Sequence, residues 1–280
     1  MPSSRLRTAR FATLRVLDRM SLLAPVYRAY EAVRSVRGSE DGDVDAGGLP
    51  VPPARLRTEV AGTPGLAWFL ESGRQQAEII RSAAERARAP LEGTRHMLDF
   101  GCGCGRVLRH WAELEGPEIH GSDFNERLAN WCADNLRFVT ASVNGLAPPL
   151  GYEAGRFDLV YAVSVFTHLP HDLERVWIDE LSRIVEPGGV LLLTTHGDSY
   201  ADRLDPEERA RYDTGEPVVR WPRVAGSNLC TTFHPEAYVR DHLAPALELL
   251  EFVPEGGTVG SRRQDLAVFR KPARGTAGST

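Results

Sequence analysis

A short run of glycines behind an acid is the stretch of this sequence most suited to binding a ligand. The run is LDFGCGCGR, and its spaced residues are Asp99, Gly101, Gly103 and Gly105. Glycine loses more conformational freedom on folding than other residues, so three of them indicate a sharp turn or a close approach by a ligand. A dinucleotide-binding loop would read G-x-G-x-x-G, but Arg106 stands at the third glycine position. The spacing therefore argues against NAD, and a tight turn without a ligand is the alternative.

Three histidines are candidates for proton transfer, because an ordinary imidazole titrates near neutral pH. His168 stands just beyond the apolar run 157–164, and His196 directly follows VLLLTT at 190–195. His234 closes a charged and aromatic stretch and ranks third. A structural or surface role is the alternative for each of them.

Two pairs of residues have spacings that metal sites also use. They are His168 with His171, and Asp198 with Asp202. His171 is better interpreted as the first residue of a helix, and the aspartate spacing is common by chance. We therefore predict no metal site.

The candidate residues lie at the ends of elements that alternate between strand and helix. Short apolar runs predict seven strands, at 96–100, 117–123, 137–143, 157–164, 190–195, 246–253 and 265–271. Helical spacing of apolar residues predicts helices at 105–114, 125–136, 171–185 and 235–244. Repeated strand–helix units imply a parallel sheet covered on both faces. We expect an α/β, Rossmann-like, doubly wound fold with a mostly parallel seven-stranded sheet, an antiparallel last strand and an N-terminal helical extension.

The chain divides into an extension, a main domain and a tail. The extension is residues 1–75, with a helix over 6–37 broken at Pro25, a linker rich in Pro, Gly and Asp over 38–55 and a helix over 64–89. The main domain is residues 76–272, with an insertion at 197–233, and residues 273–280 are predicted to be a disordered tail. We expect the extension to act as a lid, with FLESG (69–73) reaching the ligand.

The glycine motif and the segments after it resemble class I S-adenosylmethionine-dependent methyltransferases. D-x-G-x-G-x-G is similar to motif I of that family, GSDF (121–124) to the acidic end of its second strand, and RIVEPGGVLLLTT (183–195) to its fifth helix and strand. The stretch 143–170 resembles the family's path from the third strand into the fourth. Asn144 and Ala154 depart from the family, which often has acids at these positions.

The resemblance implies that S-adenosylmethionine is the cofactor and S-adenosylhomocysteine the product. It implies that Asp123 accepts hydrogen bonds from both ribose hydroxyls, and that Phe124 lies near the adenine. Asp99 would face the ammonium group at the methionine end of the cofactor. The carboxylate at the same end would accept hydrogen bonds from the backbone N–H groups of the loop. The full predicted cofactor set is Asp99, Gly101, Gly103, Asp123, Phe124, Asn144, Leu146 and Ser164, with Asn144 and Leu146 against the adenine.

The resemblance also implies methyl transfer to an acceptor, which we expect to be a hydroxyl group of a small molecule, sugar or glycolipid. His168 is the predicted catalytic base and His196 the second candidate. The insertion 197–233, with Tyr200, Tyr212 and Trp221, is expected to wall the acceptor pocket. N- or C-methylation on the same fold, or a non-catalytic cofactor-binding or scaffold protein, remains as an alternative.

The charge of the chain is unevenly distributed. The net charge is −5, which does not suggest a nucleic-acid partner. Residues 1–37 carry eight arginines against Asp18 and Glu31, so this segment is predicted either to touch a membrane surface or to pack on the acidic domain. The four cysteines are expected to be reduced thiols, and the absence of a signal peptide or long apolar span favours a cytoplasmic location.

Overall fold

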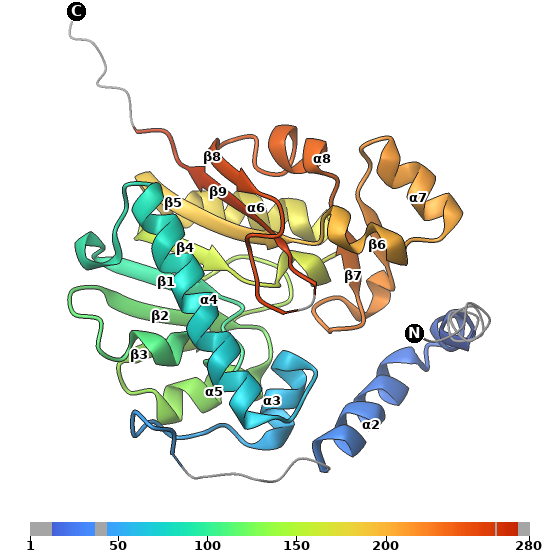
Figure 1. Ribbon diagram of the computed structural model, residues 1–280, viewed down its shortest axis with the longest axis horizontal. Helices are drawn as coiled ribbons and strands as arrows, with labels where there is room; N and C mark the ends of the chain where they lie inside the picture. The colour runs from blue at the N-terminus through green and yellow to red at the C-terminus, as the bar shows by residue number, and fades with distance from the viewer. Residues whose placement is uncertain (1–12, 37–43, 261, 274–280) are drawn as a thin grey trace, which may run out of the picture.

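A seven-stranded sheet forms the centre of the computed structural model, which describes residues 13–36, 44–260 and 262–273 (Figure 1). The strand order is β3-β2-β1-β4-β5-β9-β8. The strands are β1 (His96–Phe100), β2 (Glu118–Asp123), β3 (Val139–Val143), β4 (Phe157–Ala162), β5 (Val185–Thr195), β8 (Glu248–Val253) and β9 (Asp265–Arg270). Only β9 runs antiparallel to its neighbours, β5 and β8. The predicted sheet with an antiparallel last strand is confirmed.

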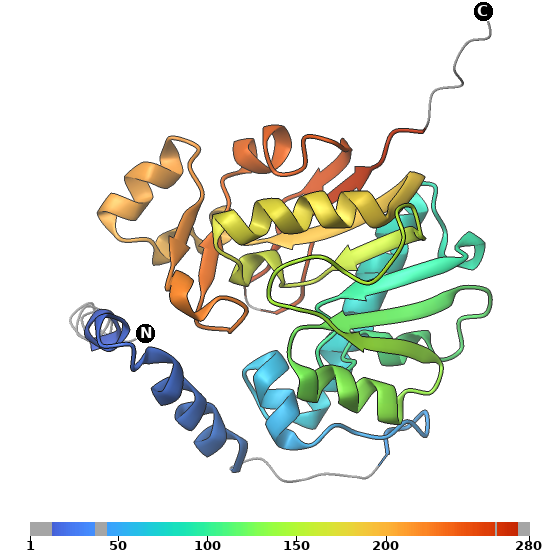
Figure 2. The same cartoon turned by 180° about the vertical axis from the view of Figure 1, so that it is seen from behind.

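Helices cover both faces of this sheet (Figures 1 and 2). Met97, Leu159 and Val190 belong to the apolar cluster beneath α4 (Leu66–Arg86), which also takes in the inner face of α5 (Glu126–Asn135). The residue that follows each of these three along its strand, such as Leu98 after Met97, belongs instead to the apolar cluster beneath α6 (His171–Ile184) and α8 (Glu236–Asp241). Alternate side chains of a strand point to opposite faces, so a sheet buried on both sides needs nearly continuous apolar strands.

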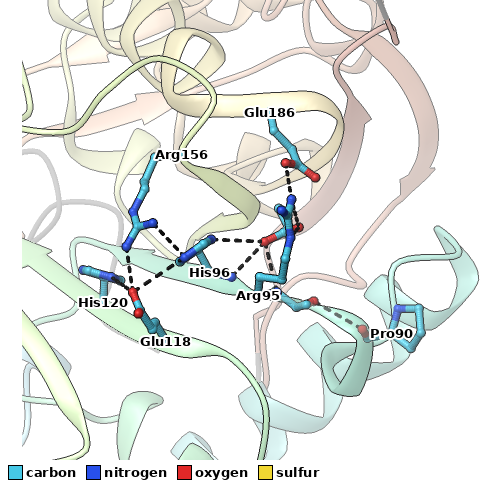
Figure 3. Close-up of polar contacts among 9 residues, drawn as sticks. Pro90, Arg95, His96, Glu118, His120, Arg156 and Glu186 are labelled. Carbon is cyan, nitrogen blue, oxygen red and sulfur yellow. Dashed lines mark hydrogen bonds and ion pairs between the residues drawn. The ribbon is translucent and has the colours of Figure 1, made fainter.

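Charged side chains join the strands at the amino-terminal edge of the sheet. Arg95 pairs with Glu186 at 2.6 Å and Arg156 pairs with Glu118 at 2.6 Å (Figure 3). Arg156 also lies 2.7 Å from Nε2 of His96. The opposite, carboxyl-terminal edge is the one at which ligands bind in such folds.

The predicted helix at 105–114 is wrong. Only one short 3₁₀ helix, η2 (Leu108–Trp111), forms after the glycine loop. Gly101, Gly103 and Gly105 all have positive φ, which keeps the chain out of the right-handed helical region up to residue 105. Val107, Leu108 and Trp111 are then buried, and the chain reaches β2 before a full helix can form.

The N-terminal extension differs from its prediction in three places. The helix there breaks between 19 and 23, where Ser21 has a φ of 57°, and Pro25 lies inside the first turn of α2 (Leu23–Val36). Proline is tolerated in a first turn because its missing N–H would have no helical partner there. The predicted linker 38–55 includes the start of α3 (Ala54–Ala61), while residues 37–43 lie outside the described part. The boundary expected at residue 75 falls inside α4.

The arm formed by residues 13–36 lies apart from the layers of the sheet and runs from α3 toward the α7 region (Figures 1 and 2). Arg15 lies 3.2 Å from Asp205, and Arg223 donates to the carbonyl of Asp18 at 3.1 Å. The arm leaves six large apolar side chains exposed: Val16, Met20, Leu22, Val26, Tyr30 and Val33. In the described part of the chain, no helix is long and apolar enough to cross a membrane.

The insertion at 197–233 is an ordered lobe beside the end of β5. It contains η4 (Asp198–Arg203), α7 (Pro206–Asp213), the strand pair β6 (Val218–Arg220) and β7 (Thr231–Phe233), and η5 (Pro222–Val224). A small apolar cluster that includes Tyr200, Tyr212 and Phe233 holds the lobe together. The lobe therefore has a core of its own next to the carboxyl-terminal edge.

Candidate active site

One cavity of about 760 Å³ lies at the carboxyl-terminal edge of the sheet. From β1 the chain first adds strands on one side of the sheet, β2 and β3, and then crosses to the other side to form β4 and β5. Open α/β sheets bind ligands at such a topological switch point, here between β1 and β4. The cavity brings together all ten predicted site residues, namely Asp99, Gly101, Gly103, Asp123, Phe124, Asn144, Leu146, Ser164, His168 and His196. Ser72 and Trp68 of α4 and Arg28 of α2 also line it, so the extension contributes to the same cavity.

The glycine loop is shaped by close contacts that leave no space for side chains. A Cβ on Gly101 would lie 2.2 Å from Cγ2 of Val165, and one on Gly103 would lie 2.7 Å from Val60. The N–H of Gly101 donates to the carbonyl of Ser122 at 2.7 Å. The loop is therefore held against β2 with its backbone facing the cavity. All four cysteines are unpaired and buried, in keeping with the expectation of reduced thiols.

Asp99 is a buried acid whose side chain has one hydrogen-bonding neighbour. Tyr161 lies beside it in the register of β1 and β4, and the tyrosine hydroxyl donates to the carboxylate. That hydroxyl accepts from the indole of Trp111 at 2.9 Å. Burial raises the pKa of Asp99 to about 7, although the Tyr161 hydrogen bond and the charge of Arg106 act in the opposite direction. Within the described residues no cation forms an ion pair with this carboxyl.

Asp123 is fixed by backbone groups on both of its oxygens. Oδ2 accepts from the N–H of Gly103 and Oδ1 from the N–H of Asn125, each at 2.8 Å. Burial raises the pKa of Asp123, and the two backbone hydrogen bonds lower it. Each carboxylate oxygen has a second lone pair, so Asp123 can accept further hydrogen bonds from a ligand in the cavity.

Apolar side chains flank this acid. Phe124 and Leu146 remain 42% and 43% exposed although they are large and apolar, and both line the cavity. The Phe124 ring lies so close to Gly226 that a Cβ there would be 2.7 Å away. Asn144 accepts from the Ser122 hydroxyl at 2.6 Å and donates to the carbonyl of Gly145 at 2.7 Å. This end of the cavity combines apolar surface with acceptors for hydroxyl groups, as a nucleoside requires.

Ser164 occupies a strained backbone position at the end of β4. Its φ is 61°, in the left-handed region that non-glycine residues rarely adopt. Its N–H donates to the hydroxyl of Thr194 at 2.8 Å, and its own hydroxyl bonds to Gln264. Such strain persists where surrounding contacts enforce it, often beside a site. These contacts orient the segment that leads to His168.

His168 presents a free ring nitrogen to the cavity. Its Nδ1 lies 2.6 Å from the carbonyl of Cys230. A carbonyl only accepts hydrogen bonds, so Nδ1 carries the proton and Nε2 has the lone pair. Burial lowers the pKa of His168, although the hydrogen bond to the Cys230 carbonyl acts in the opposite direction, so the fold favours the neutral ring. For Nε2 no partner exists in the described part of the chain, so it is available as a proton acceptor.

His196 lies next to His168, with ring centroids 6.1 Å apart and perpendicular planes. It also stacks on Tyr200 at 4.0 Å. Burial lowers its pKa well below the ordinary value, and the nearby His168, His234 and Arg203 lower it further. Its Nδ1 is buried and has no hydrogen-bond partner among the residues described.

His234, the third histidine candidate, is placed elsewhere. Its ring is fully buried and pairs with Glu174, and it is not part of the cavity wall. Burial by itself would raise the pKa of Glu174, but the charge of His234 and hydrogen bonds from His171, His234 and Tyr238 lower it to about 2. His171 is the first residue of α6, as predicted.

The aspartates considered for a metal have other partners. Asp198 accepts from the hydroxyl of Tyr212 at 2.8 Å, and Asp202 pairs with Arg262. Across the described ranges no cluster of three metal-ligating side chains occurs. Of the three aromatic residues expected to wall the acceptor pocket, Tyr200 lines the cavity and Tyr212 and Trp221 do not.

The residues present fit S-adenosylmethionine. A side chain at Gly101 would intrude where the loop must stay open. Asp99 is buried and forms no ion pair within the described residues, so its carboxyl can pair with the ammonium group of the ligand. Asp123, Phe124 and Leu146 offer acceptors and apolar surface for a nucleoside.

The comparison with protein families decides the class of the protein. A family model described as a methyltransferase domain matches residues 72–246. The chain belongs to this methyltransferase family. It carries a class I S-adenosylmethionine-dependent methyltransferase domain, and S-adenosylmethionine is the cofactor of that domain.

Individual relatives of this methyltransferase are distant. Trans-aconitate 2-methyltransferase of Rhodopseudomonas palustris (strain BisB18) is 31% identical over 109 residues, 38% of this chain and 40% of that protein. The enzyme of the same name from Azoarcus sp. (strain BH72) is 27% identical over 169 residues, 59% of this chain and 62% of that protein. The chain thus spans less than two thirds of the length of these curated relatives. Other relatives are named as O-, N- and C-methyltransferases.

A solved structure, the N-methyltransferase NodS from Bradyrhizobium japonicum WM9, is similar with 19% identity and a TM-score of 0.47, covering 74% of this chain and 98% of that one. At this level of likeness, the fold assignment rests on the strand order and the family model.

Proposed function

We propose that the protein is an O-methyltransferase that methylates a hydroxyl group of a small-molecule or glycan acceptor, with His168 as the general base. The proposal rests on His168, which lines the cavity and has no hydrogen-bond partner for Nε2 within the described residues. The carbonyl of Cys230 accepts from Nδ1–H and so fixes the tautomer in which Nε2 has the lone pair. A neutral imidazole with an open lone pair suits removal of a hydroxyl proton.

The cavity has two ends with different chemistry. The cofactor end is formed by Asp99, Gly101, Gly103 and Asp123, which would hold S-adenosylmethionine, with Phe124, Asn144 and Leu146 beside the adenine. The bound cofactor supplies an electrophilic methyl group. The acceptor end is formed by His168, His196 and Tyr200.

The residues of the acceptor end orient the nucleophile. His168 Nε2 accepts the hydroxyl proton while Nδ1 stays bonded to Cys230. His196 packs against His168 and Tyr200 and fixes the wall beside the base. The volume of the cavity lies in the range of small-molecule sites, which favours a small acceptor over a nucleic acid.

The test is the His168→Ala variant. We expect turnover to fall roughly 10²–10⁴-fold, with the affinity for S-adenosylhomocysteine nearly unchanged. Release of S-adenosylhomocysteine would be measured over a panel of hydroxylated acceptors, and binding by calorimetry. His242→Ala, at an exposed histidine outside the cavity, is the matched control and should keep full turnover. Normal turnover in His168→Ala would remove His168 from the role of base.

A further inference from the structure

The acceptor end of the cavity contains a guanidinium without a counterion. Arg203 ends η4 and lines the cavity. Its guanidinium lies 5.0 Å from the centroid of the Tyr200 ring. Within the described residues, the Arg203 side chain forms no ion pair and no hydrogen bond. Its neighbour Asp202 is directed instead to Arg262, with which it makes two hydrogen bonds of 2.5 and 2.7 Å.

The surroundings of Arg203 favour an anion beside it. Burial lowers the pKa of Arg203, and the nearby charge of Arg262 lowers it further. Arg203 is exposed on the cavity wall, and Arg262 adds to the positive charge beside it, so an anion in the cavity would meet two neighbouring guanidinium groups.

A second observation points to a ligand at the same wall. His196 is 6% exposed, and its Nδ1 has no hydrogen-bond partner in the described structure. Buried polar atoms are normally hydrogen-bonded. His196 lies between Tyr200 and His168, so a buried ring nitrogen without a hydrogen bond and a cation without an ion pair occur, among the described residues, on one short stretch of cavity wall.

We propose that the acceptor carries a carboxylate or phosphate group and that Arg203 binds this group beside Tyr200. The proposal rests on the proposed function and names the chemical class of its substrate. The guanidinium is planar, and its paired N–H groups match the oxygens of carboxylate and phosphate. The stack on Tyr200 restricts the orientation of the guanidinium, which reduces the entropy lost when an anion binds.

The anion site lies within reach of the base. Consecutive contacts of 5.0, 4.0 and 6.1 Å link Arg203 to Tyr200, Tyr200 to His196 and His196 to His168. A small molecule can therefore place its acidic group at Arg203 and its hydroxyl at Nε2 of His168. The acid would act as the anchor that selects the acceptor, because a neutral analogue would leave Arg203 unpaired.

The experiment measures anion binding directly, without methyl transfer. Malonate and inorganic phosphate would be titrated into the full chain saturated with S-adenosylhomocysteine, by calorimetry, against sodium chloride at matched ionic strength. We expect at least one anion to bind, and Arg203→Gln to weaken this binding at least tenfold. Arg203→Lys should give an intermediate loss of anion affinity, because lysine keeps the positive charge but lacks the paired N–H groups of the guanidinium. Preference for malonate or for phosphate identifies which acid the acceptor carries.

Two controls separate this proposal from the function on which it rests. Arg209→Gln, on the exposed face of α7 where Arg209 pairs with Asp213, should bind both anions as the wild type does. Affinity for S-adenosylhomocysteine should stay within twofold in Arg203→Gln, which also shows that the variant is folded. His168→Ala should keep its anion affinity, so loss of the base and loss of the anchor are distinguishable. The proposal is overturned if neither anion binds better than chloride, or if Arg203→Gln binds them as tightly as the wild type.

Discussion

The charged form of Asp99 is unfavourable in the folded protein, yet it is the form that would bind a ligand cation. Its ordinary pKa is 3.8 and its pKa in the folded chain is about 7, because burial disfavours the charged form. Folding therefore takes up a proton between about pH 4 and pH 7. In the absence of a ligand, Asp99 destabilises the folded protein increasingly as the pH rises through this range. A cation bound beside the carboxylate would reverse the shift.

This leads to a pH-dependent binding prediction. If the ammonium of the ligand lies beside Asp99, binding of S-adenosylhomocysteine near pH 7 should release a proton. Its affinity should rise about tenfold between pH 6 and pH 8, as the carboxyl that must be charged loses its proton. Calorimetric titrations in two buffers of different ionisation enthalpy measure the proton release.

Asp99→Asn is the matched variant for this prediction. It should bind S-adenosylhomocysteine more weakly, without the proton release, and should melt at a higher temperature than the wild type at pH 8, because no charge is buried. Equal proton release by wild type and Asp99→Asn would show that another group is responsible.

At the scale of elements, the glycine loop depends on the helix that packs against it. Gly73 of α4 faces this loop, and a Cβ at Gly73 would lie 2.1 Å from the carbonyl oxygen of Arg106 and 2.9 Å from Nε2 of His110. Glycine inside a helix destabilises it by about 0.5–1 kcal/mol relative to alanine, so its presence here reflects the close approach of two backbones. The position of α4 thereby helps to set the position of the loop.

Gly73→Ala should therefore destabilise the protein despite the better helix propensity of alanine. Overpacking against backbone destabilises by about 1–3 kcal/mol, and the displaced loop should also weaken binding of S-adenosylhomocysteine. Chemical denaturation and calorimetry measure the two effects. Gly151→Ala is the control, since a Cβ there would meet nothing within 4 Å. A Gly73→Ala variant as stable as the wild type would contradict the close packing.

At the scale of the whole molecule, the N-terminal arm is charged and amphipathic and lies apart from the layers of the sheet (Figures 1 and 2). Val26, Tyr30 and Val33 follow one face of α2, and they are 46%, 51% and 60% exposed. The ion pair of Arg15 with Asp205 is itself exposed, and such pairs contribute about 0–1 kcal/mol. Arg28 of the same helix lines the cavity. The exposed apolar face with its arginines suits an anionic lipid surface, and Arg28 suits a lid over the site.

If the arm lies on a membrane surface, the full chain should sediment with vesicles of anionic lipid and should be released as salt rises above about 0.1 M, where the screening length is about 10 Å. A chain lacking residues 1–37 should stay in the supernatant and still bind S-adenosylhomocysteine. The substitution pair Val26→Asp and Val33→Asp should reduce sedimentation, because it puts charge on the apolar face.

Val176→Asp, on α6, is the control for that pair, since Val176 is 42% exposed outside the arm, and it should sediment as the wild type does. Absence of vesicle binding by the full chain would leave only the lid role for the arm. In that case the truncation should loosen ligand binding.

Local patterns in the sequence were sufficient to predict the positions of the seven sheet strands along the chain and a mostly parallel sheet with an antiparallel last strand, while the resemblance to methyltransferases implied the cofactor residues that line the cavity. Strand periodicity is local, and the carboxyl ends of parallel strands meet at one edge, so residues after β1, β2, β4 and β5 had to come together. The glycine spacing also excluded the helix-start geometry of a dinucleotide loop.

Contacts between distant parts of the chain decided the rest. Tyr161 and Trp111 were not predicted beside Asp99, because only the register of β1 with β4 and the burial of η2 bring them there. The helix expected at 105–114 was lost to packing of apolar side chains beneath α4, which outweighs helix propensity. Among the described residues Arg203 forms no ion pair, because its neighbour Asp202 pairs with Arg262 across 60 residues. Burial and pairing of charges depend on the whole fold, so these properties of the site emerge only in the tertiary structure.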